Sequence, residues 1–332
     1  MTYLGKRGYT IYKECLDEKD ISIIKNDLTV KPHSSHLASN IEPFPIFRES
    51  DTKIYLPRYY GIEYYGMYEK SLITNGITID CPFKGDLRDY QNKIVDKFIK
   101  HVGNSGGGLL DVEPGKGKTV MGLNIISKLK RKTLVVVHKS FLVNQWIERI
   151  NQFIPNAKVG KIQGSVIDVE DKDIVIGMIQ SLCSKQYDSN IWDDFGFTIF
   201  DECHHLSAEM FMKVMIKIVT TYTLGLSGTM TRKDGLSKVF KYFIGNVIHK
   251  EKSDLSVNVL IKSIAFKSSD EEYNKDILDF RGMVQYSSMI NKLCDYQPRT
   301  EFINQVLINE LKLNPNQPVS YTHLRAHETG YN

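Results

Sequence analysis

The chain of 332 residues lacks the features that mark secreted, membrane-spanning or disordered proteins. Its five cysteines are scattered, odd in number and without a C-x-x-C pair, which argues against a disulfide scaffold or a cysteine-based zinc site. No stretch approaches the roughly 18 uncharged apolar residues of a membrane helix, and the N-terminal segment has no apolar signal-peptide core. We therefore expect an intracellular protein of a reducing compartment, without a membrane partner.

An excess of charge of one sign is also missing. The 43 basic and 39 acidic residues give a net charge of +4, which permits a nucleic-acid partner but does not imply one. With 42% apolar and 25% charged residues, the composition is that of an ordinary globular protein. Composition thus excludes several classes, and the positive evidence comes from motifs.

From about residue 81 onward, apolar runs of four to six residues alternate with helical stretches. This alternation is typical of a parallel sheet with helices on both faces, in which phosphate ligands bind at the carboxyl ends of the strands. The predicted helices cover residues 119–131 and 140–152. The predicted strands are Leu109–Val112, Thr133–Val137, Asp173–Met178, Phe197–Phe200 and Tyr222–Leu226. We therefore predict an α/β fold for this part of the chain.

Residues 1–80 are predicted to form a small α+β accessory region. Six of the eighteen tyrosines lie between residues 55 and 68. One interpretation is a platform on which nucleic-acid bases stack. The other, which we favour, is that the rings fill a small core.

Residues 253–318 are predicted to hold a strand within 256–266 and an amphipathic helix over 300–313. The helix carries apolar residues on one side, namely Phe302, Val306, Leu307 and Leu311. A buried strand should follow, but residues 319–332 are polar and without period. They resemble a translated sequencing-library adapter, so we expect an assembly artefact there and a longer gene product. A natural polar tail is the alternative.

The segment EPGKGKT lies between a predicted strand and a predicted helix, as a P-loop does. Its glycines let backbone N–H groups turn toward phosphate oxygens, and the helix adds its partial positive charge. Lys118 is expected to reach the β- and γ-phosphates, and Thr119 to hold Mg²⁺. The strict motif has Gly where this chain has Val112, so an incidental glycine-rich turn is the alternative. The candidate nucleotide-binding residues are Pro114, Gly115, Lys116, Gly117, Lys118, Thr119 and Val120.

Asp201 and Glu202 end another apolar strand. Asp201 is placed to bind Mg²⁺, and Glu202 to orient and deprotonate an attacking water. The following Cys203, His204 and His205 could suggest zinc, but adjacent histidines project in different directions and no second pair lies at ligand spacing. We interpret His204 as a catalytic coupling residue beside the γ-phosphate.

The DECH sequence after a P-loop resembles superfamily 2 helicases and translocases of the DExH kind. Other motifs follow in that family's order, namely LRDYQ at 87–91, HKSFLVNQW at 138–146, GMIQSL at 177–182 and LSGTMTRKDGL at 226–236. The R-x-DG element in the last motif resembles the xeroderma pigmentosum B type, phage UvsW and the transcript-release helicases of large DNA viruses. The resemblance is strongest over residues 86–236 and implies a RecA-like ATP-binding domain at 81–252, in a protein of viral type that acts in a host cell.

The resemblance also implies ATP and Mg²⁺ as cofactors, and nucleic acid, DNA more than RNA, as the partner. Gln91, supported by Arg88, would hydrogen-bond the adenine edge. Ser227, Gly228 and Thr229 would couple the γ-phosphate site to strand movement. Glycine replaces the family's usual alanine in this SGT, a change that we expect to be tolerated. The nucleic-acid backbone would be contacted by His138, Lys139, Ser140, Gln180, Ser181 and Arg232.

In this family a second RecA-like domain carries the arginine finger, and residues 253–318 would be only its start. We therefore expect the chain to bind ATP·Mg²⁺ weakly, to hydrolyse it poorly and not to unwind a duplex. The leading hypothesis is an ATP-driven DNA helicase or translocase. The alternatives are an RNA helicase or transcript-release factor of the same fold, a non-catalytic nucleic-acid-binding fragment, and a P-loop kinase or GTPase, although the sequence has no N-K-x-D guanine element.

A basic cluster follows the P-loop helix, and it has two interpretations. One is attraction of the phosphate backbone. The other, which we favour, is favourable placement of cations at the end of a helix. The cluster consists of Lys128, Lys130, Arg131 and Lys132.

Overall fold

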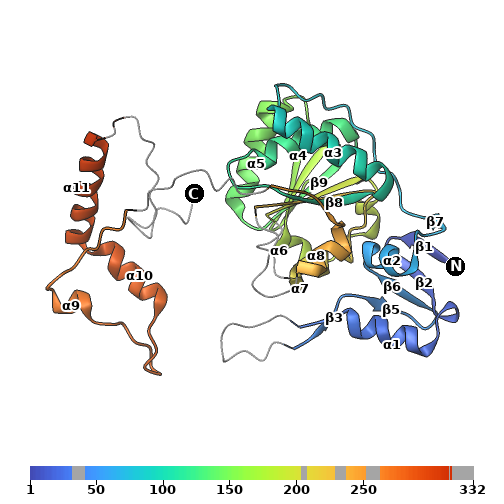
Figure 1. Ribbon diagram of the computed structural model, residues 1–332, viewed down its shortest axis with the longest axis horizontal. Helices are drawn as coiled ribbons and strands as arrows, with labels where there is room; N and C mark the ends of the chain where they lie inside the picture. The colour runs from blue at the N-terminus through green and yellow to red at the C-terminus, as the bar shows by residue number, and fades with distance from the viewer. Residues whose placement is uncertain (32–41, 203–207, 229–236, 252–261, 314, 316–332) are drawn as a thin grey trace. The chain divides into compact units, whose positions relative to one another are not determined.

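The computed structural model describes residues 1–31, 42–202, 208–228, 237–251, 262–313 and 315 (Figure 1). The chain divides into two compact units, Met1–Ser253 and Asp254–Asn332. No helix in the described part combines the length and the apolar character that crossing a bilayer requires.

An eight-stranded sheet forms the centre of the first unit (Figure 1). Its strands lie in the order β11-β10-β12-β9-β13-β14-β8-β15, and every neighbouring pair is parallel except β10 with β11. The strands are β8 (Gly107–Asp111), β9 (Thr133–Val137), β10 (Val159–Gln163), β11 (Val166–Ile167), β12 (Ile174–Met178), β13 (Phe197–Asp201), β14 (Tyr222–Ser227) and β15 (Val247–Lys250). The five predicted strands are thus present, and all lie next to one another in the sheet.

Helices cover both faces of this sheet (Figure 1). One face carries α3 (Asp89–Ser105), α4 (Lys118–Leu129) and α5 (Ser140–Phe153), and the other carries α6 (Ile179–Ser184), α7 (Ala208–Met215) and α8 (Ser237–Ile244). A short 3-10 helix, η2, spans Ser189–Trp192.

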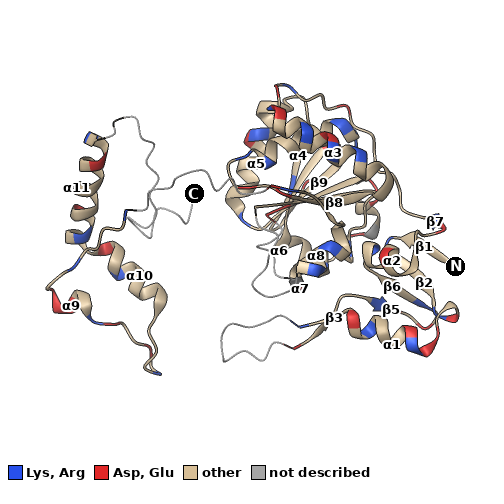
Figure 2. Cartoon of the chain, in the orientation of Figure 1, with Lys and Arg blue, Asp and Glu red and all other residues tan. Residues whose placement is uncertain are grey.

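Side chains of successive strand residues enter two different cores, because a strand alternates its faces. Leu110 and Val135 pack in the core beneath α3 to α5, whereas Leu109 and Val136 pack in the core toward α6 to α8. Figure 2 shows the charged residues on the outer helices, while the central strands are almost entirely tan. The predicted α/β fold with both faces covered is therefore confirmed.

The accessory region begins the same unit with a five-stranded sheet of order β5-β6-β2-β1-β7 and a separate β3–β4 pair. Its strands are β1 (Thr2–Gly5), β2 (Gly8–Tyr12), β3 (Thr29–Val30), β4 (Phe44–Pro45), β5 (Arg48–Glu49), β6 (Lys53–Leu56) and β7 (Lys70–Ser71). Its helices are η1 (Lys13–Cys15), α1 (Glu18–Asp27) and α2 (Arg58–Tyr65).

The tyrosines of this region mostly fill a core. Tyr60 on α2 is buried and meets Tyr242 of α8 edge-on, with ring centroids 5.1 Å apart. Tyr65 and Tyr68 pack against the same core, whereas Tyr64 is exposed. The accessory region therefore shares a hydrophobic core with the α8 side of the large sheet, which favours the core interpretation over a stacking platform.

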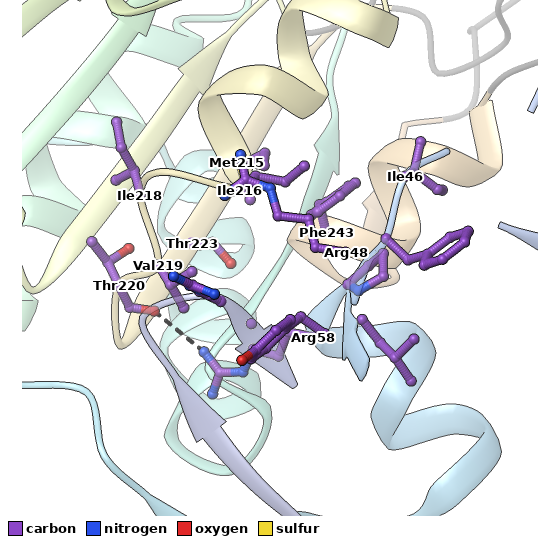
Figure 3. A pocket seen from close by; sticks show the side chains of 16 residues that line it. Ile46, Arg48, Arg58, Met215, Ile216, Ile218, Val219, Thr220, Thr223 and Phe243 are labelled. Carbon is purple, nitrogen blue, oxygen red and sulfur yellow. Dashed lines mark hydrogen bonds between the residues drawn. The ribbon is translucent and has the colours of Figure 1, made fainter. Parts of the chain in front are cut away.

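A buried arginine also joins the two regions. Arg58 is 8% exposed and donates hydrogen bonds to the carbonyl oxygens of Thr220 (3.4 Å) and Thr221 (2.9 Å) and to the hydroxyl of Tyr68 (3.2 Å). Figure 3 shows its guanidinium directed toward Thr220 at the wall of a pocket that both regions line. A Cβ at Gly106 would lie 2.3 Å from Arg58 Nη2, so the close approach requires glycine there.

The second unit contains α9 (Glu271–Asn274), α10 (Tyr286–Asp295) and α11 (Gln297–Leu313). The helix predicted over 300–313 is present within α11. The strand predicted over 256–266 is not confirmed, because residues 262–266 have no regular structure and the rest of that segment lies outside the described residues. An apolar run becomes a strand only beside a partner that takes its hydrogen bonds, and residues 262–266 pair with none in the described chain.

Arg58→Met should lower the free energy of unfolding by about 1–3 kcal/mol, because it leaves buried carbonyl groups without their donor. Urea denaturation measures this effect. The matched control is Arg48→Met, since Arg48 lines the same pocket but is exposed, and its effect should stay within about 0.5 kcal/mol. Equal effects of the two substitutions would contradict the role given to Arg58.

Candidate functional site

A pocket lies where β13 and β8, on either side of β14, end at the carboxyl edge of the sheet, and α3, α4 and α5 also line it. Its volume of about 490 Å³ is in the range of small-molecule and cofactor sites. The predicted site residues that line it are Arg88, Gln91, Pro114, Gly115, Gly117, Lys118, Thr119, Val120, Asp201 and Glu202. Residues from three separate motifs therefore come together at one cavity.

The loop before α4 has the backbone that a phosphate cradle needs. Gly115 and Gly117 have φ values of 80° and 81°, in the left-handed region that glycine adopts without strain. A Cβ at Gly117 would lie 2.5 Å from Gln91 Nε2, so space as well as conformation requires glycine. Helix α4 begins at Lys118 and brings its N-terminal N–H groups to the pocket.

Gln91 connects this loop to α3. Its Oε1 accepts from the Arg88 backbone N–H (3.0 Å), and its Nε2 donates to the Lys116 carbonyl (2.9 Å). The Tyr90 hydroxyl donates to the same carbonyl (3.0 Å). Lys116 thus contributes its backbone, while its ammonium lies 3.5 Å from Glu251 and does not line the pocket.

Lys118 and Glu202 meet directly. Lys118 Nζ lies 3.1 Å from Glu202 Oε1 and donates to the Val112 carbonyl at 3.3 Å. Glu202 has a φ of 47°, a left-handed conformation that is uncommon for a residue with a side chain and is often found at functional sites. The end of β13 therefore turns sharply, and the carboxylate reaches the P-loop lysine.

Asp201 is 5% exposed and its Oδ2 accepts a hydrogen bond from Trp146 Nε1 at 2.7 Å. The pKa of Asp201 is raised to about 6, chiefly by burial and further by the Glu202 charge, while the Trp146 hydrogen bond and Lys118 limit the rise. Asp201 and Thr119 line the same pocket and offer hard oxygen ligands. Because Mg²⁺ is commonly held by one or two protein oxygens plus substrate phosphates, these residues fit that ion.

The coupling residues lie against the P-loop as far as they are described. Ser227 is fully buried at the end of β14, and its carbonyl accepts from the Val112 N–H at 2.8 Å. A Cβ at Gly228 would lie 3.0 Å from Pro114 Cδ and 3.3 Å from Lys118 Nζ. Glycine therefore allows a closer approach here than alanine would, and the expected tolerance of glycine in place of the family's usual alanine stays a prediction. Thr229, Arg232 and His204 lie outside the described residues.

Most of the predicted nucleic-acid residues that are described lie together. His138 directly follows β9, with exposed Lys139 and Ser140 after it, and exposed Gln180 donates to the His138 carbonyl at 3.0 Å. Ser181 differs from the expectation, since it is 7% exposed and its hydroxyl accepts from the Gly164 N–H at 2.9 Å. The structure thus assigns the Ser181 hydroxyl to the fold rather than to the surface.

The basic cluster at 128–132 has partners within the protein. Lys128 pairs with Asp96, Lys130 with Asp80 and Lys132 with Asp194, while Arg131 donates to the Thr78 hydroxyl. These contacts agree better with a structural role than with phosphate attraction.

Sequence reasoning missed the contribution of α5 to the pocket. Leu142, Gln145, Arg149 and Phe153 line it, and their spacing of three, four and four residues places them on one helix face. That spacing was readable in the sequence, but only the strand order shows that this face meets the P-loop.

Lys118 can pair with Glu202 because β8 and β13, separated by β14 alone, end at the same edge of the sheet. With the glycine loop before α4, this arrangement defines a P-loop nucleotide-binding domain of the RecA-like class.

Comparison with known proteins finds helicases among the relatives of this chain. Residues 84–232 match the family model described as "Type III restriction enzyme, res subunit". A predicted ATP-dependent RNA helicase of Acanthamoeba polyphaga mimivirus is 35% identical over 319 residues, which cover 93% of this chain and 61% of the relative. The DNA 3′-5′ translocase XPB2 of Sulfurisphaera tokodaii is 29% identical over 199 residues, which cover 58% of this chain and 43% of the relative.

Among solved structures, the UvsW helicase from bacteriophage T4 has a similar fold, with a TM-score of 0.50 and 13% identity, covering 70% of this chain and 94% of UvsW. The chain is similar in sequence to helicases and to a DNA translocase, which is consistent with a superfamily 2 helicase. It spans less than two thirds of the length of the mimivirus relative and of XPB2.

Glu202→Gln should preserve nucleotide binding and lower hydrolysis by about 10²-fold or more, because an amide cannot accept the proton of an attacking water. Binding of a fluorescent ATP analogue and phosphate release with enzyme in excess measure the two effects. The matched control is Glu209→Gln on α7, whose carboxylate is exposed and paired with Lys213. Unchanged phosphate release in Glu202→Gln would remove Glu202 from the role of base.

Asp201→Asn should stabilise the nucleotide-free protein at neutral pH, on the order of 1–3 kcal/mol. The pKa of Asp201 is raised from 3.8 to about 6 on folding, so its ionisation makes stability fall as pH rises through this window. The gain should therefore disappear below about pH 4. Thermal unfolding across pH measures it, with exposed Asp96→Asn as the control. A loss of stability at neutral pH would contradict the direction of the pKa shift.

Proposed function

We propose that this chain carries the ATP-hydrolysing domain of a nucleic-acid helicase or translocase, and that the nucleic acid is DNA. The observation that carries the proposal is the meeting of Lys118, Asp201 and Glu202 around one pocket beside the P-loop glycines. A P-loop lysine and two neighbouring carboxylates are the groups that phosphoryl transfer from a nucleotide requires.

In the proposed mechanism the residues of the pocket divide the work. Gln91 and Arg88 bind the adenine, and the loop from Pro114 to Val120 holds the phosphates. Lys118 exchanges its Glu202 partner for the γ-phosphate, so Glu202 can orient the attacking water and take its proton. Thr119 and Asp201 would hold Mg²⁺, which when bound neutralises phosphate charge.

The hydrolysis site is proposed to drive movement through the segment that follows β14. Ser227 and Gly228 lie against the P-loop, so a change at the γ-phosphate reaches this strand end directly. His138, Lys139, Ser140 and Gln180 stand at neighbouring strand ends and are proposed to contact phosphates and sugars without reading base sequence.

We propose that residues 1–80 are an accessory region, 81–252 the first motor domain, and 253–318 the linker and start of a second. The partial coverage of the relatives supports this division. We also propose a viral origin, since the mimivirus relative aligns with most of the chain.

DNA and RNA are the two candidate substrates. The R-x-DG element at residues 232–235 and the XPB2 relative, which is named as a DNA translocase, support DNA. The mimivirus relative is named as an RNA helicase, which makes an RNA helicase the second candidate.

ATP hydrolysis by the chain should be stimulated more by DNA than by RNA, with a low rate throughout if a second domain supplies the arginine finger. Phosphate release is measured with single-stranded DNA, duplex DNA and RNA of matched sequence, and Lys118→Ala is the inactive control. Greater stimulation by RNA would favour the RNA helicase. Nucleotide binding without stimulation by any of them would favour a non-catalytic binding fragment.

A further inference from the structure

Trp146 connects the two halves of the phosphate site. It is fully buried on α5, and its indole N–H donates to Asp201 Oδ2 at 2.7 Å. On its other side, the ring faces α4, where a Cβ at Gly122 would lie 3.1 Å from Trp146 Cη2. The indole therefore lies between the helix that begins at Lys118 and the strand that ends at Asp201.

Both the buried donor and the buried acceptor need this hydrogen bond. A buried indole N–H needs an acceptor, since an unsatisfied buried donor costs about 1–3 kcal/mol. A buried carboxylate likewise needs donors, and Asp201 also accepts from the backbone of Glu202. Leucine or phenylalanine could fill the same core between α4 and β13, but neither could donate to the carboxylate.

The bond also fixes an orientation. A carboxylate on a short side chain can rotate, and a donor that holds one oxygen restricts where the other oxygen lies. Gly122 gives the ring room to reach Asp201, because a larger residue on α4 would press against the indole. The sequence therefore combines a tryptophan on α5, a glycine on α4 and an aspartate on β13 in one contact.

We propose that Trp146 is a positioning residue that orients Asp201 for the Mg²⁺ of a bound nucleotide. The inference rests on the proposed ATP site and adds a residue to it. It also makes Trp146 a reporter of that site, because Asp201, which accepts the indole hydrogen bond, would hold Mg²⁺ when the nucleotide is bound.

The test isolates the N–H group from the shape of the ring. The chain has two tryptophans, and Trp192 lies in a separate aromatic cluster with Tyr187 and Phe195. In a Trp192→Phe reference protein, residue 146 is varied in two ways. One is Trp146→Phe, and the other is replacement by benzothienylalanine, which keeps the shape of tryptophan but has no N–H. A single cooperative urea transition in each protein, with the folded state fully populated under the assay conditions, verifies folding.

Affinity for a fluorescent ATP analogue is then measured with Mg²⁺ and with a chelator. Both replacements should reduce the gain in affinity that Mg²⁺ provides by about 10-fold, while the affinity without metal stays within about 2-fold. In the reference protein, Trp146 emission should change more with Mg²⁺·nucleotide than with nucleotide alone.

The outcomes separate the inference from the proposed function. Equal loss of affinity with and without Mg²⁺ would overturn the positioning role and leave Trp146 a packing residue. An unchanged Mg²⁺ gain in the benzothienylalanine protein would overturn it as well. Failure of the reference protein itself to bind nucleotide would overturn the proposed ATP site, and the inference with it.

Discussion

The functional geometry depends on the parallel alignment of β8, β14 and β13. Parallel neighbours end at the same edge, so the loop after β8 and the turn after β13 face each other although they are far apart in sequence. The Lys118–Glu202 contact is a consequence of that alignment. An antiparallel β13 would send its last residues to the opposite edge, and the same motifs would then not meet.

Burial strengthens the electrostatic interactions of the site, but it also lowers the stability of the folded protein. Asp201 lies in surroundings that favour its neutral form, and Lys118 is buried beside it. Desolvated charges act strongly on a bound phosphate or metal because little water screens them. The apolar strands on both sides are buried almost completely. Their burial offsets the free energy that it costs to bury charged groups at the site.

The sequence predicted the parts of the fold that local patterns determine. The strand Thr133–Val137 was located to the residue, since a β-branched run buried on both faces has no competing pattern. Helix α3 was not predicted, although Ile94, Phe98 and Val102 have helical spacing. The strand predicted within 256–266 is not confirmed, since residues 262–266 have no pairing partner among the described strands and residues 256–261 lie outside the described part.

For the site, the motifs located the lining residues but not their mutual contacts. Ser181 and Gln180 are adjacent in sequence, yet one hydroxyl is buried against Gly164 while the neighbouring amide is exposed. The Trp146–Asp201 hydrogen bond joins residues that no local pattern connects. Such contacts depend on the rotation of each helix and on the strand order, and tertiary packing determines both.

The contacts of Lys118 and Gln91 indicate how binding of the proposed nucleotide would change the site. Glu202 neutralises Lys118 where a γ-phosphate would sit, and Gln91 holds the Lys116 carbonyl where adenine recognition would occur. Under the proposed function, ATP would replace Glu202 as the partner of Lys118. Because a Cβ at Gly228 would lie 3.0 Å from Pro114 Cδ and 3.3 Å from Lys118 Nζ, the same replacement would act on the end of β14. Such coupling would need no long-range pathway, since the γ-phosphate site and this strand end are adjacent.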